Sequence, residues 1–147
     1  MNTALRNLLL ISAFIFVNNA FAEGKEKWKS PETVEGTEAI SLEQAKVMHA
    51  EGVTFVDVRS SRQYNKRHIP GAIHLYIKDE FTEVNLLMHV KKNESFVVYC
   101  NGAHCSLSSK AARKAVAWGF TKIKYYRDGF RAWRKDGNPL EYGIKNN

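Results

Sequence analysis

Residues 96–105 read FVVYCNGAHC, and this stretch carries the strongest indication of the fold. Its first four residues are β-branched or aromatic, which predicts a buried strand that ends at Cys100. A loop over 101–105 follows, and an apolar helical face then runs from Leu107 until Gly119 ends it. A strand, a short loop and a helix in direct succession indicate an α/β unit.

Strands and helices alternate on both sides of this unit. A capping box, formed by Ser41 and Gln44, predicts the start of the first helix. Because alternating strands and helices imply parallel pairing with crossover connections, we predict an α/β fold with a central, mostly parallel β-sheet and helices on both faces. Strand patterns lie at 53–58, 73–77 and 123–126, and helical patterns lie at 41–52, 61–64, 84–90 (Val84, Leu87 and Met88) and 130–134.

Charged and nucleophilic side chains come at the ends of two predicted strands. Asp57 and Arg59 end the strand at 53–58, and Cys100 ends the strand at 96–99. Ligands of parallel sheets bind outside the carboxyl ends of the strands. The pattern therefore places an acid, a base and a thiol at one edge of the sheet, where chemistry is expected.

The loop after Cys100 indicates a reactive thiolate. Backbone N–H groups of a glycine-containing loop and the start of a helix both favour negative charge, so we expect the pKa of Cys100 to be lowered. A cysteine at the end of a core strand can equally be a small buried apolar residue. The residues alone leave both interpretations open.

Three segments of the chain, in order, resemble the rhodanese-like domain family from about Ser41 to Tyr142. The resemblance implies a rhodanese-like α/β fold and a sulfurtransferase that uses no cofactor. In such an enzyme a cysteine takes sulfane sulfur from a donor such as thiosulfate and passes it as a persulfide to a thiophilic acceptor. The segments are Phe55–Arg59 with Tyr64 and His68–Ile73, then Val97–Cys100 with Ala111 and Ala112, and finally Gly119 and Phe120 with Asp128–Phe130, Trp133, Gly137, Pro139 and Leu140.

The resemblance also implies roles for individual residues. Cys100 matches the catalytic cysteine, and Asp57 and Arg59 are expected to brace its loop from the neighbouring strand end. The loop amides are expected to stabilise the anionic persulfide. The residues of this active-site loop are Asn101, Gly102, Ala103, His104 and Ser106.

The loop departs from the common pattern of the family in two ways. It is longer between Cys100 and Ala111, and it carries a second cysteine, Cys105, so the preference for thiosulfate is open. Ser106 stands where the phosphatase and arsenate-reductase branch has arginine, which argues against phosphatase activity.

Cys105 has two possible roles. As a resolving thiol it attacks the persulfide on Cys100, releases sulfide and leaves a disulfide. As a structural residue it forms a static disulfide with Cys100, which an oxidising compartment favours. His104 lies between the two cysteines, but three ligands so close together match no known zinc spacing, and we expect no metal.

The N-terminus predicts export. Arg6, an apolar run at 8–17 and the sequence Ala20-Phe21-Ala22 are typical of a signal peptide over 1–22, and the run is shorter than the roughly 20 residues that span a bilayer. We expect a periplasmic or secreted protein without a membrane anchor after cleavage. The expected parts are an exposed leader at 23–37, the rhodanese-like domain at 38–142 and a C-terminal tail at 143–147.

Composition limits the partners. The chain has 147 residues with 22 Lys and Arg against 15 Asp and Glu, a net charge of +7, and two cysteines, which excludes a disulfide-rich scaffold. The positive charge suits a small anionic sulfur donor, whereas nucleic acid is not expected for an exported chain. A thiol acceptor or a redox partner protein fits the cysteine pair.

The leading hypothesis is a periplasmic sulfurtransferase with Cys100 as persulfide carrier. One alternative is a non-catalytic binding module for a partner or a soft metal, with Cys100 and Cys105 locked as a disulfide. The other is a thiol-disulfide redox protein that uses the same cysteine pair.

Overall fold

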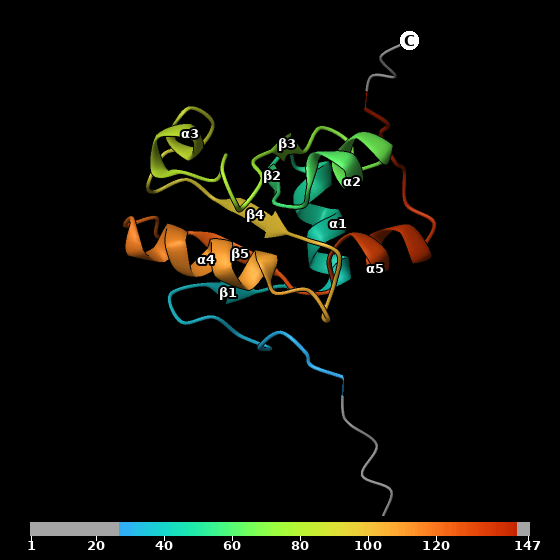
Figure 1. Ribbon diagram of the computed structural model, residues 1–147, viewed down its shortest axis with the longest axis horizontal. Coiled ribbons are helices and arrows are strands. Elements are labelled where there is room, and N and C mark those ends of the chain that lie inside the picture. Colours follow the sequence, from blue (N-terminus) through green and yellow to red (C-terminus); the bar gives the residue numbers. More distant parts are fainter. Residues whose placement is uncertain (1–26, 144–147) are drawn as a thin grey trace, which may run out of the picture.

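Five parallel strands form the centre of the protein in the computed structural model, which describes residues 27–143 (Figure 1). Neighbouring strands follow the order β1-β5-β4-β2-β3, and every pair is parallel. This arrangement confirms the predicted fold class. The strands are β1 (Glu38–Ala39), β2 (Thr54–Asp57), β3 (Ile73–His74), β4 (Phe96–Tyr99) and β5 (Ile123–Tyr126).

Helices cover both faces of this sheet. One apolar core joins β4 and β5 to residues of α4 and α3, and a second core joins the opposite side of the same strands to residues of α1 and α5. Along β4 the burial alternates accordingly, because Val98 belongs to the first core and Val97 to the second. The helices are α1 (Leu42–Ala50), α2 (Ser61–Lys66), α3 (Glu83–Leu87), α4 (Leu107–Ala117) and α5 (Gly129–Lys135).

The first helix starts as the sequence predicts. The Ser41 Oγ accepts a hydrogen bond from the Gln44 N–H at 3.2 Å, and the Gln44 Oε1 accepts one from the Ser41 N–H at 2.8 Å. These two bonds form the capping box and satisfy two N–H groups that the helix leaves unpaired.

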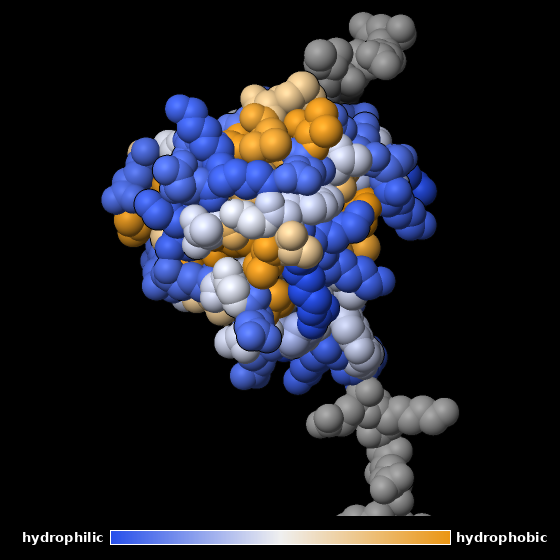
Figure 2. Space-filling model, turned by 90° about the vertical axis from the view of Figure 1, so that its left-hand side faces the viewer, coloured by the Kyte–Doolittle hydropathy of each residue, from blue (hydrophilic) through white to orange (hydrophobic). Residues whose placement is uncertain are grey.

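The third helix turns the opposite way from the prediction. Val84, Leu87 and Met88, which give the apolar spacing, are 71%, 44% and 69% exposed, and Leu86 is buried in their place. Figure 2 shows apolar side chains gathered over α3 on an otherwise largely hydrophilic face. The helix has only five residues, so one buried leucine suffices to fix its orientation.

Two edge strands differ from the sequence prediction. β3 ends at His74 and not at 77, because the chain turns there and the Tyr76 carbonyl accepts from the N–H groups of Glu80 and Phe81. β1 was not predicted, since its two residues, Glu38 and Ala39, are both exposed and show no apolar pattern. Its pairing with β5 fixes where the N-terminal segment enters the domain.

Most described residues of the expected exposed leader at 23–37 are exposed, but two of them, Ser30 and Val34, pack on the domain, and 23–26 lie outside the described residues. Ser30 and Val34 are 2% and 3% exposed, and Val34 belongs to the apolar core beside α4. The expected signal peptide at 1–22 and the tail beyond 143 lie outside the described residues. No helix among residues 27–143 has the length and hydropathy of a membrane span.

Candidate functional site

The parallel register brings the predicted site residues together. Asp57, the last residue of β2, pairs with Tyr99, the last residue of β4, so Arg59 and Cys100 leave the sheet side by side. An acid, a base and a thiol therefore meet at the carboxyl edge, as the sequence predicts. The geometry follows from topology alone, because β2 and β4 are neighbours and run in the same direction.

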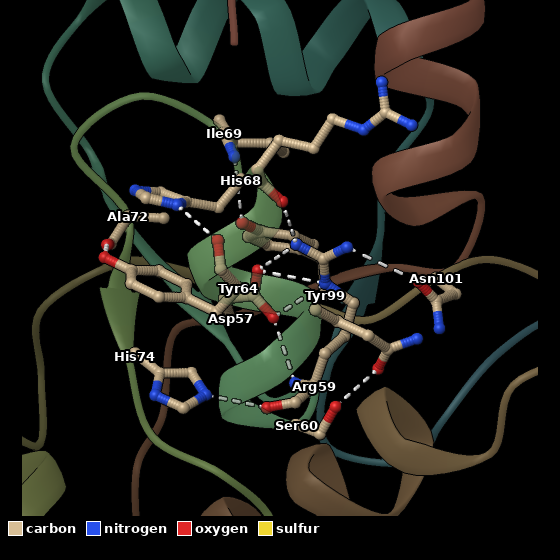
Figure 3. A network of polar contacts seen from close by, with 12 residues as sticks. Asp57, Arg59, Ser60, Tyr64, His68, Ile69, Ala72, His74, Tyr99 and Asn101 are labelled. Atoms are coloured by element: carbon tan, nitrogen blue, oxygen red, sulfur yellow. Dashed lines mark hydrogen bonds and ion pairs between the residues drawn. The ribbon is translucent and has the colours of Figure 1, made fainter. Parts of the chain in front are cut away.

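Asp57 and Arg59 form a buried, forked ion pair at this edge (Figure 3). The Arg59 Nη2 lies 2.6 Å and its Nε 3.0 Å from the Asp57 Oδ2, and the Arg59 N–H donates to the Asp57 Oδ1 at 2.9 Å. The carboxylate is 0% and the guanidinium 2% exposed. Burial alone lowers the pKa of Arg59, but the hydrogen bonds and charge of Asp57 outweigh burial and raise that pKa, so the guanidinium stays charged.

The same guanidinium connects β2 to the active-site loop. Its Nη1 lies 3.4 Å from the Asn101 Oδ1, its Nη2 donates to the Arg67 carbonyl at 3.0 Å, and its centre lies 4.1 Å from the Phe130 ring centroid. Arg59 thus contacts the first loop residue, the end of α2 and the start of α5 at once. This geometry agrees with the bracing role that the resemblance implies.

The turn after α2 is held from within the same network (Figure 3). The Tyr64 hydroxyl donates to the Ala72 carbonyl at 2.7 Å, and the His68 Nδ1 lies 2.9 Å from the Tyr64 carbonyl. The Ile69 N–H donates to the Tyr99 hydroxyl at 3.2 Å. The His-Ile-Pro-Gly-Ala segment is therefore structural, and it fixes the position of β3 beside β2.

The start of α5 supports the active-site loop through backbone hydrogen bonds. The N–H groups of Phe130 and Arg131 donate to the carbonyls of Cys100 and Asn101 at 2.9 and 3.0 Å. Gly129 precedes them with φ +58°, and a Cβ at this position would collide with the Cys100 carbonyl oxygen and lie 3.0 Å from the Gly102 nitrogen. Only glycine permits this approach. Asp128–Phe130 belongs to the family resemblance, but no local sequence pattern predicts this contact.

The N-terminal segment supports the loop from the other side. The Ser30 N–H donates to the Ala103 carbonyl at 2.7 Å, and the Ser30 hydroxyl donates to the same oxygen at 3.0 Å. The Arg127 guanidinium holds the Ser30 carbonyl with two bonds of 3.0 and 3.1 Å, and a His104 ring nitrogen lies 2.9 Å from the Trp28 carbonyl. The sequence carries no local signal for these contacts, which join residues more than 70 positions apart.

The two cysteines differ in their access to solvent. Cys100 is 0% exposed, and its Sγ lies 3.2 Å from the Ser108 hydroxyl and 3.4 Å from the Cys105 carbonyl. Cys105 is half-buried and faces a pocket of about 410 Å³. Both side chains are free thiols in the structure.

The pKa values of the two neighbouring thiols shift in opposite directions. The Cys105 thiol, together with burial, raises the pKa of Cys100, contrary to the expected lowering. The Cys100 thiol lowers the pKa of Cys105 to about 6, with help from the N–H groups of Leu107 and Asn101 and the charge of Arg131. The loop amides and the cation thus stabilise negative charge at Cys105, whereas Cys100 receives only the Ser108 hydroxyl and N–H.

The other predicted loop residues surround the pocket, with one exception. Asn101, Gly102, Ala103 and His104 line it together with Cys105, Arg131 and neighbouring residues of α5. Ser106 lies at the N-terminus of α4, where its carbonyl accepts from the Ser109 hydroxyl at 3.0 Å, and its side chain makes no capping bond. The arrangement is a pocket lined by one cysteine, one arginine and one aspartate (Cys105, Arg131 and Asp128), with Cys100 fully buried beside Cys105.

Known proteins share this sequence and fold. The family model of the rhodanese-like domain matches residues 41–136. The thiosulfate sulfurtransferase GlpE of Pseudomonas savastanoi is 30% identical over 95 residues, which cover 65% of this chain and 85% of that protein. The HTH-type transcriptional regulator Rv0324 of Mycobacterium tuberculosis is 36% identical over 91 residues, but the match covers only 38% of the regulator's length.

Solved structures give the same result. The BH2092 protein of Bacillus halodurans has a TM-score of 0.64 at 26% identity, and the match covers 71% of this chain and 77% of that one. The human single-domain sulfurtransferase TSTD1 has a TM-score of 0.57 at 21% identity, covers 66% and 95% of the two chains, and is similar in fold alone. These matches confirm the resemblance that the sequence motifs predicted.

Proposed function

Because the chain is a sulfurtransferase of the rhodanese-like domain family, we propose that Cys100 carries the transferred sulfur as a persulfide between an anionic donor such as thiosulfate and a thiol acceptor. The observation that carries this proposal is the position of Cys100, directly after β4 and inside the family match. Cys100 and the loop that follows it are held by three parts of the protein. Arg59 contacts the Asn101 side chain, the start of α5 binds the carbonyls of Cys100 and Asn101, and the N-terminal segment binds the carbonyl of Ala103.

The cysteine pair supplies the nucleophile. With the pKa of Cys105 lowered to about 6, Cys105 is the thiolate at neutral pH and lies beside the Cys100 thiol, which keeps its proton. Transfer of that proton to Cys105 leaves a thiolate on Cys100, so Cys105 acts as the adjacent base that activates a weak nucleophile. The Ser108 hydroxyl, 3.2 Å away, then donates to the Cys100 sulfur.

The donor reaction forms one bond and breaks one. The Cys100 thiolate attacks the outer sulfur of thiosulfate, the sulfur–sulfur bond of thiosulfate breaks, and sulfite leaves with the electron pair. An acceptor thiolate then attacks the terminal sulfur of the Cys100 persulfide, takes that sulfur and restores the Cys100 thiolate. No net oxidation occurs, which agrees with a mechanism that needs no cofactor.

The pocket beside Cys105 suits an anionic donor. Arg131 lines it, and loop N–H groups that stabilise one negative charge at Cys105 are also available to a bound anion. Its volume of about 410 Å³ exceeds what a thiosulfate ion requires, so the donor and part of an acceptor fit in turn. Support for a periplasmic or secreted location comes from the signal-peptide pattern at 1–22.

A second candidate function uses the same two thiols for redox exchange. Cys105 places a second thiol beside the persulfide carrier, because the Cys100 Sγ lies 3.4 Å from the Cys105 carbonyl oxygen. The Cys105 thiolate can attack the inner sulfur of the Cys100 persulfide, form a disulfide and expel hydrosulfide, after which an external dithiol must reduce the pair. This route releases sulfide and needs a reducing partner, whereas simple transfer needs neither.

Sulfite release during turnover tests the proposal. Wild type, Cys100→Ser and Cys105→Ser receive thiosulfate and a neutral thiol, and sulfite and sulfide are measured. We expect Cys100→Ser to release no sulfite and Cys105→Ser to release it more slowly, because the base is lost. Full sulfite release by Cys100→Ser would overturn the assignment. Sulfide that wild type, but not Cys105→Ser, releases after exposure to thiosulfate alone, before the neutral thiol is added, would favour the redox route.

A further inference from the structure

A second pocket lies beside the active-site loop, between α2 and α5, and we propose that it binds the carboxylate groups of a small anionic thiol that accepts the sulfur. This inference rests on the proposed function, because it names the chemical class of the acceptor. The pocket has a volume of about 230 Å³. Five of its lining side chains are cationic, namely Arg59, Lys66, Arg67, Arg131 and Arg134.

The positive charge of this pocket is largely uncompensated. Arg59 is paired with Asp57, but Lys66, Arg67, Arg131 and Arg134 form no ion pair within the described part of the chain. Among residues 27–143, none with a carboxylate side chain lines the pocket. Lys66, Arg131 and Arg134 are exposed, and the combined positive charge of the four side chains attracts an anionic ligand.

The side chains of this pocket favour a carboxylate over an anion that lacks two coplanar oxygen atoms. Three of these four cations are arginines, whose planar guanidinium groups bind carboxylates through two parallel hydrogen bonds. The volume of about 230 Å³ is below the roughly 300–1,000 Å³ that is usual for drug-sized ligands, which suits one or two carboxylates.

The pocket is connected to the reactive cysteines. Asn101 and Arg131 line both this pocket and the pocket that Cys105 faces. A ligand with its carboxylates among the arginines can therefore extend its thiol past Asn101 toward the cysteine pair. The carboxylates of the acceptor then lie in the cationic pocket, and its thiol reaches the adjoining pocket that Cys105 faces. The donor needs only the pocket that Cys105 faces.

Paired acceptors that differ in charge test this assignment. The protein is loaded with thiosulfate, freed of excess donor, and mixed with mercaptosuccinate, which has two carboxylates, or with neutral 2-mercaptoethanol. Rates are compared at equal persulfide content, as measured by intact mass. The readout is the ratio of the two second-order rate constants, so a change in intrinsic persulfide reactivity cancels.

The test variant is Lys66→Gln combined with Arg134→Gln. We expect its ratio to fall about tenfold or more, because a charge-assisted hydrogen bond contributes more than one factor of ten in binding. The control is Lys122→Gln combined with Lys135→Gln, two exposed lysines that line none of the pockets described above and give the same change in net charge. An unchanged ratio in the test variant, or an equal fall in the control, would overturn the proposal.

A binding measurement separates this inference from the proposed function. Calorimetry with succinate, which has both carboxylates and no thiol, reports on the pocket whether or not a persulfide forms. We expect succinate to bind wild type and the control and to bind the test variant at least tenfold more weakly. If wild type binds succinate in this way but does not load sulfur, the proposed function is wrong and the carboxylate site is supported. If wild type loads sulfur but does not bind succinate, the proposed function is supported and the carboxylate site is wrong.

Discussion

The Ser30 N–H donates to the Ala103 carbonyl at 2.7 Å, and this bond joins the segment before the first strand to the loop between the two cysteines. The bond lies next to the residues that line the pocket of Cys105. The reactive loop is therefore supported from outside the compact α/β unit that the family match covers. Its geometry depends on the N-terminal segment as well as on the sheet.

Arg127→Ala is expected to loosen this support. The variant removes two charged hydrogen bonds to the Ser30 carbonyl, and we expect a loss of about 1.5 kcal/mol in the free energy of unfolding. Hydrogen exchange of the amides at 101–105 should accelerate, and sulfur transfer should slow severalfold. Arg113→Ala, in an exposed position of α4, is the control and should leave both unchanged. Equal exchange in the two variants would argue against a supporting role for residues 28–31.

Arg59→Ala is expected to be strongly destabilising. It leaves the Asp57 carboxylate buried without a partner, which costs about 3–5 kcal/mol, and it removes the contact with Asn101. Arg59→Lys keeps the charge but loses the fork, so it should fall between wild type and Arg59→Ala. Urea unfolding and transfer rates measure both effects. Wild-type stability of Arg59→Ala would contradict the description of this pair.

Gly129→Ala is expected to damage the loop directly. The new Cβ has an unfavourable φ of +58° and collides with the Cys100 carbonyl, so both stability and sulfur transfer should decrease. Gly137→Ala is a matched control, because Gly137 also has a positive φ of +81°, but a Cβ added there would meet no neighbouring atom within 4 Å. The control should lose only about 1 kcal/mol of stability, the usual cost of the left-handed conformation, and keep its activity. Equal activity losses in the two variants would contradict the close approach of α5 to the loop.

The rate of alkylation should depend on pH in a way that identifies the thiolate. Because the pKa of Cys105 is lowered to about 6, its reaction with iodoacetamide should rise through a midpoint near pH 6 and level off above pH 7. Cys100, whose pKa is raised, should react more slowly than Cys105 over this range. Peptide mass mapping locates the label. Labelling of Cys100 before Cys105 at pH 7 would contradict the assignment of the thiolate.

The sequence predicts the central sheet well because its strands carry strong local signals. The runs at 96–99 and 123–126 coincide with β4 and β5, and both are β-branched or aromatic at nearly every position. Parallel topology then brings Asp57, Arg59 and Cys100 together without further information. The short α3 was misjudged, because Val84, Leu87 and Met88 suit a buried helical face but lie on the surface.

The support of the loop could not be predicted from local patterns. The contacts of Ser30 with Ala103 join residues 73 positions apart, and one of them runs between backbone atoms that any residue at these positions would offer. The pKa of Cys100 was misjudged for a related reason. A loop and a helix start predict a site for negative charge, but burial and the neighbouring Cys105 thiol raise the pKa of Cys100, and the sequence shows neither effect.

The most direct test of the persulfide mechanism is the intact mass of the reduced protein after exposure to thiosulfate, determined beside Cys100→Ser and Cys105→Ser. We expect a gain of one sulfur atom in wild type and in Cys105→Ser, with peptide mapping at Cys100, and no gain in Cys100→Ser. A sulfur atom that persists in Cys100→Ser, or no gain in reduced wild type, would contradict a persulfide carried by Cys100 from thiosulfate.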